Sequence, residues 1–298
     1  MKKADYGSMA VVKCLMIGVD HMKRLYQKFM FVLFACLFIV SGCSSSNSNK
    51  TASPKQVLID AIEYSNQLEA FHEEYEDKLT RGDTIYHMFN NNYAVFPSQA
   101  AYLITFQNAV GGNYNRVYIS KYTQTDATSV QGTSSSTSFR DLTVTDANSY
   151  SERYDSYIDK EYFTSLFEHL IANDVSNYVS FDMEKNDDGY LITITLSDME
   201  KYNEVCKDKG IEQYGEDVFG SYLEFCMTVQ INKGLIQRIT WENKRDWDGV
   251  IDESNSVATY TPCSIDKINT SLVDDLVHQT KSNVIGEGSY LTLDDLIR

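Results

Sequence analysis

Apolar and polar residues alternate most regularly in the last third of the chain. On one side of an extended chain the apolar positions are Leu223, Phe225, Met227, Val229 and Ile231. A period of two is typical of a β-strand that buries one face. A turn signal follows at 232–234, and the alternation resumes from 235 to 241. The pattern predicts a β-hairpin over these residues.

Weaker alternation predicts further strands elsewhere in the chain. The segments are 102–106, 117–119, 179–183, 190–196 and 257–261. A hairpin turn is expected at 185–189. Residues 71–79 alternate too and could extend a preceding helix, although a strand is slightly favoured. The stretch 123–138 has almost no apolar residues, so we expect a mobile loop there.

Helical spacing of apolar residues appears in four separate segments. Ser53 and Pro54 mark a helix start, and the apolar positions that follow lie on one face up to Leu68. A second helix is predicted over 158–172, with an apolar face rich in aromatic residues. Shorter helices are expected from 198 to 206 and from 264 to 276, with a final turn near the C-terminus.

These elements define the expected fold class. Strict period-two strands joined by short turns predict an antiparallel sheet. Helices that occur in few, separated pieces are expected on one side of it. We therefore predict one α+β domain over residues 54–298.

The N-terminal region has a different pattern. Met22, Lys23 and Arg24 precede an apolar run from Phe29 to Val40, which is shorter than the roughly 20 residues of a membrane-spanning helix. The ending at 40–43, Val-Ser-Gly-Cys, resembles the bacterial lipobox. The resemblance implies cleavage between Gly42 and Cys43 and attachment of a diacylglyceryl lipid to the Cys43 thiol.

The lipobox resemblance divides the first 53 residues into three parts. Residues 22–42 are the expected lipoprotein signal peptide, and 43–53 a polar tether that starts at the lipidated cysteine. Residues 1–21 do not fit this scheme, so we expect Met22 to be the true start. An ordinary signal peptide or an uncleaved anchor is the alternative. The expected location is the cell membrane, with the protein lipid-anchored and facing away from the cytoplasm.

Charge and cysteine usage narrow the function. The chain has 42 Asp and Glu against 26 Lys and Arg, a formal net charge of −16. Such an acidic protein is a poor partner for nucleic acid or for anionic lipid head groups.

Beyond Cys43 the cysteines are Cys206, Cys226 and Cys263, which permit at most one internal disulfide. No C-x-x-C spacing occurs, so we predict separate thiols and neither a redox motif nor a zinc site.

Candidate chemistry is sparse. His72 lies beside an acidic cluster of Glu73, Glu74, Glu76 and Asp77, which could be a metal site or an acid–base pair. A solvated face is the favoured interpretation, because no second histidine is three or four residues away. The segments 184–189 and 246–249 resemble calcium loops only faintly, and a plain turn is favoured for both. Because no G-x-S-x-G, dinucleotide or phosphate-loop motif is present, we expect no enzyme activity, no cofactor and no bound metal. A hydrolase is the minor alternative, since catalytic triads are set by geometry and not by order in the sequence.

The order of elements and the hairpin at 227–239 resemble the LolA/LolB-like lipoprotein-carrier superfamily over residues 53–262. The segment 123–138 and the tail after Cys263 depart from that pattern. The resemblance implies a strongly curved antiparallel sheet, an open half-barrel, with helices packed on its concave face and an acyl chain between them. Tyr162, Phe163 and Phe167 are candidates to contact such a hydrophobic ligand, although aromatic residues at this spacing are usually core.

The resulting function hypothesis is a lipid-anchored, non-enzymatic protein that binds or carries a hydrophobic ligand. The alternative is a surface interaction or sensing module that meets a protein or glycan partner. A hollow space between sheet and helices favours the first, and a filled interior favours the second.

Overall fold

We analysed a computed structural model of the chain. The structure describes residues 52–110, 114–123, 126–134, 142–148, 161–209, 213–214, 218–281 and 289–298. The expected signal peptide, the lipobox-like ending with Gly42 and Cys43, and all but the end of the expected tether lie outside these residues. No helix in the described part is long and apolar enough to span a membrane.

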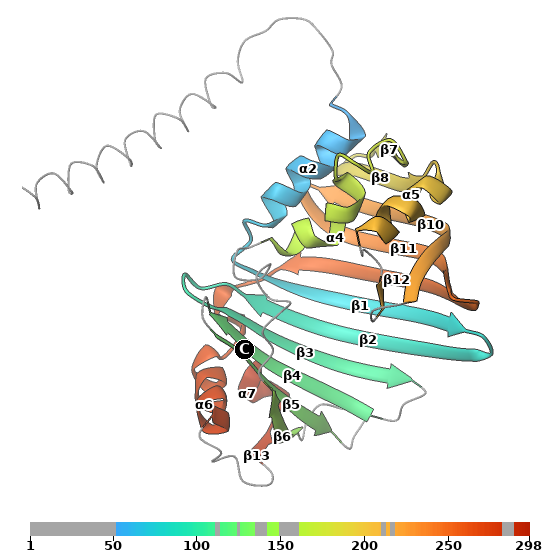
Figure 1. The fold of residues 1–298 in the computed structure, drawn as a ribbon. Helices are drawn as coiled ribbons and strands as arrows, with labels where there is room; N and C mark the ends of the chain where they lie inside the picture. Colours follow the sequence, from blue (N-terminus) through green and yellow to red (C-terminus); the bar gives the residue numbers. More distant parts are fainter. Residues whose placement is uncertain are drawn as a thin grey trace, which may run out of the picture. The chain divides into compact units, whose positions relative to one another are not determined.

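The described residues form one large antiparallel sheet with a few helices (Figure 1). The strands are β1 (Ala70–Arg81), β2 (Thr84–Val95), β3 (Ala101–Val110), β4 (Tyr114–Thr123), β5 (Asp126–Ser134), β6 (Leu142–Asn148), β7 (Val179–Lys185), β8 (Gly189–Leu196), β9 (Gln213–Tyr214), β10 (Val218–Asn232), β11 (Leu235–Trp247), β12 (Val250–Pro262) and β13 (Ser289–Leu291). The helices are α2 (Pro54–Ser65), α4 (Tyr162–Ile171), α5 (Met199–Asp208), α6 (Thr270–Lys281) and α7 (Leu293–Leu296), with a 3-10 turn η2 (Ile265–Lys267).

The sheet is open. Its strand order is β13-β6-β5-β4-β3-β2-β1-β12-β11-β10-β8-β7, and β9 pairs only with β10. The end strands β13 and β7 do not pair with each other among the described residues. The long pairing of β1 with β12, which matches Phe71 with Pro262 and Arg81 with Asp252, joins the two halves of the chain.

Local sequence signals explain where several elements begin and turn. The Ser53 hydroxyl accepts a hydrogen bond from the Gln56 backbone N–H and caps α2. Asp198 caps α5 in the same way through the Lys201 N–H. The β10–β11 hairpin turns through Lys233 and Gly234, both with positive φ, a conformation that favours glycine. The hairpin predicted over 223–241 is therefore confirmed.

The cross-strand register assigns side chains to two faces of the sheet. We call the face that carries Phe71, Ala94 and Leu103 face A, because these three are paired across β1, β2 and β3. On face A the residues of β8, β10, β11 and β12 pack with α2, α4 and α5 into one hydrophobic core. Figure 1 shows these three helices gathered near β7, β8 and β10.

A second core lies on the opposite face, face B, around β3 to β5. Ile104, Ile119 and Val130 are paired across these strands and are fully buried. They pack against Val273 and Leu276 of α6. The Tyr102 hydroxyl donates a 3.0 Å hydrogen bond to Asp274 and ties this helix to the sheet. The expectation that all helices share one face is therefore wrong for α6 and α7.

The expected mobile loop at 123–138 is also wrong for its first part, because residues 126–134 form β5. Val130 is buried against Ile119, and the Ser120 hydroxyl donates a 2.9 Å hydrogen bond to Ser129. Paired hydroxyls satisfy one another, so this strand needs few apolar residues. Residues 135–138 lie outside the described part. Residues 70–81 form β1, which confirms the strand slightly favoured there.

Candidate functional site

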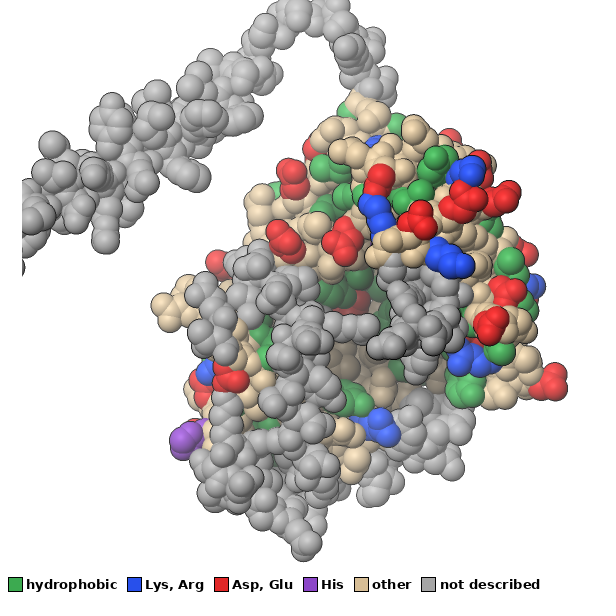
Figure 2. Space-filling model, in the orientation of Figure 1, with side chains coloured by type: hydrophobic (Ala, Val, Ile, Leu, Met, Phe, Trp, Pro, Cys, Tyr) green, Lys and Arg blue, Asp and Glu red, His purple; other side chains and the backbone are tan. Residues whose placement is uncertain are grey.

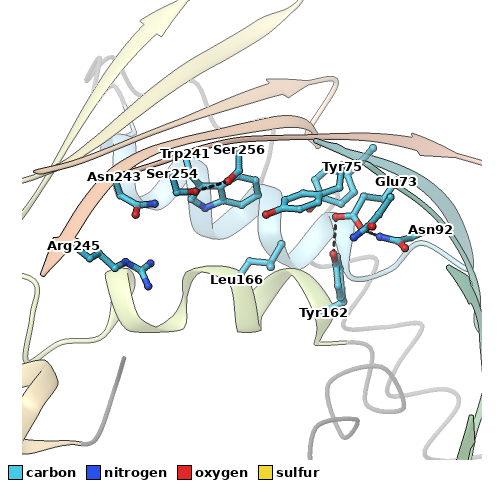
Figure 3. A pocket seen from close by; sticks show the side chains of 12 residues that line it. Glu73, Tyr75, Asn92, Tyr162, Leu166, Trp241, Asn243, Arg245, Ser254 and Ser256 are labelled. Carbon is cyan, nitrogen blue, oxygen red and sulfur yellow. Dashed lines mark hydrogen bonds between the residues drawn. The ribbon is translucent and has the colours of Figure 1, made fainter. Parts of the chain in front are cut away.

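A cavity of about 450 Å³ lies between α4 and face A of the sheet (Figure 3). Strands β2, β1, β12 and β11 line one side, and Tyr162 and Leu166 of α4 line the other. Figure 2 shows the same face of the molecule in space-filling form, with several Asp and Glu side chains exposed over the region of the helices. The sheet residues around it are Glu73, Tyr75, Asn90, Asn92, Trp241, Asn243, Arg245, Ser254, Ser256 and Tyr260.

Glu73 marks one end of the cavity. Its position follows from alternation, since Phe71, Glu73 and Tyr75 share a face of β1, and Glu73 pairs with Asn92 on β2 and Tyr260 on β12. The residue is only 7% exposed. Its carboxylate accepts hydrogen bonds from the Tyr162 hydroxyl at 2.9 Å and from the Asn92 amide. The helix and the sheet are therefore joined at this carboxylate.

Aromatic side chains form the middle of the wall. The rings of Tyr75 and Trp241 meet edge to face with centroids 6.3 Å apart. Burial raises the pKa of Tyr75, whose hydroxyl is hydrogen-bonded to Ser256, so the phenol stays neutral at physiological pH. Ser254 and Ser256 both donate to Asp77, at 3.0 and 2.7 Å. This part of the wall offers π-faces and a neutral hydroxyl.

Arg245 lies at the other end of the cavity (Figure 3). Its guanidinium lies over the Tyr222 ring at 4.5 Å and donates a 2.8 Å hydrogen bond to the Tyr222 hydroxyl. The centre of the Trp247 ring is 5.8 Å from the guanidinium carbon of Arg245. Cation–π contacts of this kind hold an arginine in place.

Two acceptors in the wall lack partners. The side-chain oxygens of Asn90 and Asn92 are buried and accept no hydrogen bond from any described residue. A buried polar atom without a partner costs on the order of 1–3 kcal/mol, so such atoms often indicate a missing ligand or water. Both asparagines line the cavity.

The structure separates the three aromatic candidates from the sequence. Tyr162 lines the cavity and bonds to Glu73. Phe163 is 1% exposed and packs on Phe71 and Tyr260 with centroids 5.6 and 5.0 Å apart. Phe167 is fully buried in the same core. Among these three residues, only Tyr162 stays a candidate for ligand contact.

The acidic cluster of β1 is also divided by the strand. Glu73 and Asp77 are on face A, while His72, Glu74 and Glu76 are on face B. The interpretation of the cluster as a solvated face is therefore wrong for Glu73. No group of metal-ligating side chains occurs among the described residues. Cys206, Cys226 and Cys263 are free thiols, as the spacing predicted.

Sequence reasoning missed most of the wall. Asn90, Asn92, Asn243 and Arg245 carried no motif, and the strand that holds the first two was not predicted. One signal was available, because a run of three asparagines at 90–92 is unfavourable in an ordinary strand. Such a run makes sense where the strand face meets a polar cavity.

Comparison with known proteins gives weak relationships. No protein-family model matches the chain, and no curated protein matches it. Among solved structures, the lipoprotein LppX of Mycobacterium tuberculosis aligns at 10% identity over 73% of this chain and 100% of its own, with a TM-score of 0.28. LprF of Mycobacterium bovis aligns at 11% identity over 74% and 98%, with a TM-score of 0.27.

A LolA superfamily protein of Nitrosomonas europaea aligns at 13% identity over 71% of this chain and 92% of its own, with a TM-score of 0.20. Similarity at this level does not indicate which ligand this chain binds, so a function has to be inferred from the cavity itself.

Proposed function

We propose that this chain is a lipid-anchored, extracytoplasmic binding protein that holds an amphipathic ligand in the cavity between α4 and the sheet. The observation that carries the proposal is a hollow of about 450 Å³ whose wall contains aromatic rings and unpartnered amide oxygens. Ligand pockets of proteins span roughly 300–1,000 Å³ and combine apolar walls with a few polar groups. The anchor would be the lipid on Cys43, and α4 would cover the concave side of an open half-barrel.

The composition of the wall supports an amphipathic ligand over a plain acyl chain. Leu166, Trp241 and Tyr260 offer apolar surface, while Glu73 and Asn92 offer polar atoms. A pure hydrocarbon would strip water from these polar atoms without replacing their hydrogen bonds, which is unfavourable. A ligand with an apolar part and a polar part matches both kinds of surface.

Two observations favour binding over the other classes. Ser254 and Ser256 hydrogen-bond to Asp77 and to each other, and within the described part of the chain neither bonds to a histidine that could act as a base. The hollow cavity favours a ligand over the alternative of a module with a filled interior that docks a protein or glycan on its surface.

The test is native mass spectrometry of the full chain, purified from the membranes of its own host in detergent. We expect the intact mass of a chain that starts at Cys43 and carries a covalent diacylglyceryl group. We also expect a noncovalent adduct that disappears after organic extraction. A clean mass without a noncovalent adduct, before extraction, would contradict the proposal.

A matched pair of variants connects the adduct with the cavity. Leu166→Trp fills the space under α4 and should abolish the adduct. Leu223→Trp places the same indole at a position that is 45% exposed and should leave the adduct in place. Equal adducts in both variants would place the ligand elsewhere.

A further inference from the structure

We infer that the ligand carries an organic ammonium group, bound at the Glu73 end of the cavity. This inference rests on the proposed function and adds the chemical class of the polar group. Charge, hydrogen-bonding capacity and aromatic surface at this end of the cavity all favour a cation that donates hydrogen bonds.

The charge at this end of the cavity favours an ammonium. Glu73 is 7% exposed, and its two hydrogen-bond donors, Tyr162 and Asn92, are neutral. No ion pair within the described residues involves Glu73, although Arg81 and Lys121 pair with other carboxylates. Burying a carboxylate without a cation is costly. A bound ammonium would supply the missing positive charge.

The hydrogen-bonding capacity of β2 also favours an ammonium. The unpartnered oxygen of Asn92 belongs to the same side chain whose amide nitrogen donates to Glu73. The unpartnered oxygen of Asn90 is two residues away on the same face of β2. Both oxygens have almost no exposed surface without ligand, so an ammonium would reach them after the two side chains turn toward the cavity. Both atoms accept and cannot donate, and a primary ammonium provides three donors and no acceptor.

The aromatic surface around Glu73 is suited to a cation as well. Tyr260 is its register partner on β12, and Tyr162 is its hydrogen-bond partner on α4. The rings of Tyr162 and Tyr260 are 6.3 Å apart, and Tyr75 is two residues further along β1. Aromatic faces attract cations, with more energy at desolvated sites than at exposed ones.

Neutral and anionic ligands fit this end less well. A hydroxyl can donate to Asn90 or Asn92 but leaves the charge of Glu73 uncompensated. A carboxylate would meet acceptors and a like charge. Arg245 is the cation among the described residues that line this cavity, and it is at the opposite end and lies against Tyr222.

The test uses three probes with the same eight-carbon tail: octylamine, 1-octanol and octanoate. Binding to the full chain, purified in detergent and depleted of its native ligand, is measured by isothermal titration calorimetry at pH 7.5, with each probe kept below its micelle-forming concentration. Because the tail is constant, the head group decides any difference. We expect octylamine to bind about 10- to 100-fold more tightly than the other two, the range of a charge-assisted hydrogen bond.

Two variants locate the preference. Glu73→Gln keeps the shape of the side chain and removes its charge, so octylamine should lose its advantage over octanol. Glu74→Gln removes the same charge from the exposed neighbour on face B and should leave the advantage unchanged. A Gln side chain accepts only one of the two hydrogen bonds that the carboxylate accepts from Tyr162 and Asn92, so some loss of melting temperature without ligand is expected, and the head-group preference is the readout.

The outcomes separate this inference from the proposed function. Equal affinity for the three probes, a preference for octanoate, or a preference that survives Glu73→Gln overturns the ammonium inference and leaves the binding function standing. If no probe binds, the inference is overturned, and the native adduct alone decides on the binding function. If Glu73→Gln does not fold, the head-group preference of the parent protein decides the inference.

Discussion

At the scale of single residues, the free thiols give a direct chemical prediction. Burial raises the pKa of the Cys226 and Cys263 thiols, and the nearby Glu242 adds to the effect at Cys226. Because the thiolate is the reactive form, we expect both residues to react with iodoacetamide at pH 7.5 more slowly than glutathione does. Cys206, which has no exposed surface, should react only after unfolding. A time course of peptide mass spectrometry measures all three, and rapid labelling or a disulfide-linked peptide would contradict the prediction.

Single residues also show what the sequence could reveal of the site. Helical spacing placed Tyr162 and Phe163 on a broad apolar face, but neighbours in a helix are about 100° apart, so one reaches the cavity and the other the core. Glu73 was visible within an acidic cluster. Glu73 alternates with Phe71 and Tyr75, which is the sequence signal that its side chain points inward. The neighbouring acidic residues made the whole segment look like an exposed face.

At the scale of elements, one ion pair closes the pairing of β1 with β12. Arg81 donates to the Asp252 carboxylate through two nitrogens, one of them at 2.6 Å, and Asp252 is 5% exposed. Arg81→Met leaves this carboxylate buried without its cation and should cost about 2 kcal/mol in the free energy of unfolding. Urea denaturation monitored by circular dichroism measures the change.

The control for that prediction is the exposed pair of Lys244 and Glu253 on the same group of strands. Lys244→Met should leave the urea midpoint unchanged within error. The double variant Arg81→Met, Asp252→Leu removes both charges and should recover most of the loss. A loss of equal size for Lys244→Met would mean that burial of the carboxylate is not the cause.

Elements with one apolar face were predictable, and elements that border the cavity were not. Strands β8, β10 and β11 bury apolar residues on face A, so alternation found them. Strand β2 presents Asn90 and Asn92 to the cavity, and β5 buries hydroxyls, so neither shows a period of two. A bulge at Tyr222 and Glu224 buries Tyr222 and exposes Leu223, which alternation alone assigned to the core.

At the scale of the whole described part, the apolar face of the sheet changes sides. Residues of β10 to β12 are apolar on face A, and residues of β3 to β5 are apolar on face B. The polar part of face A around β1 and β2 is where the first core ends, and the cavity lies there. The α+β class and the antiparallel sheet were readable from local patterns. The change of sides was not, because it depends on pairings such as β1 with β12 that join distant parts of the chain.

Both faces carry tyrosines that are partly or fully buried, so the stability of the whole domain should fall at high pH. Burial raises the pKa of Tyr75 on face A and of Tyr93 and Tyr102 on face B. In the unfolded chain a tyrosine ionises near pH 10, while the folded protein keeps these three protonated to higher pH. Between the two values the unfolded state binds fewer protons, so rising pH favours it. The stabilisation is thus complete below about pH 10 and is lost as pH rises through the folded-state values.

We expect the free energy of unfolding in urea to decrease from pH 9 to pH 11. The part of the phenolate absorbance at 295 nm that comes from these three tyrosines should appear only when the protein unfolds. The double variant Tyr93→Phe, Tyr102→Phe removes two of the three groups from the titration, so its stability should decline less steeply over the same range. Tyr64→Phe, a change at a position that is 50% exposed, serves as the control and should follow the parent curve. A stability that stays constant to pH 11, or equal slopes for the parent and the double variant, would show that these buried phenols do not set the alkaline limit of the fold.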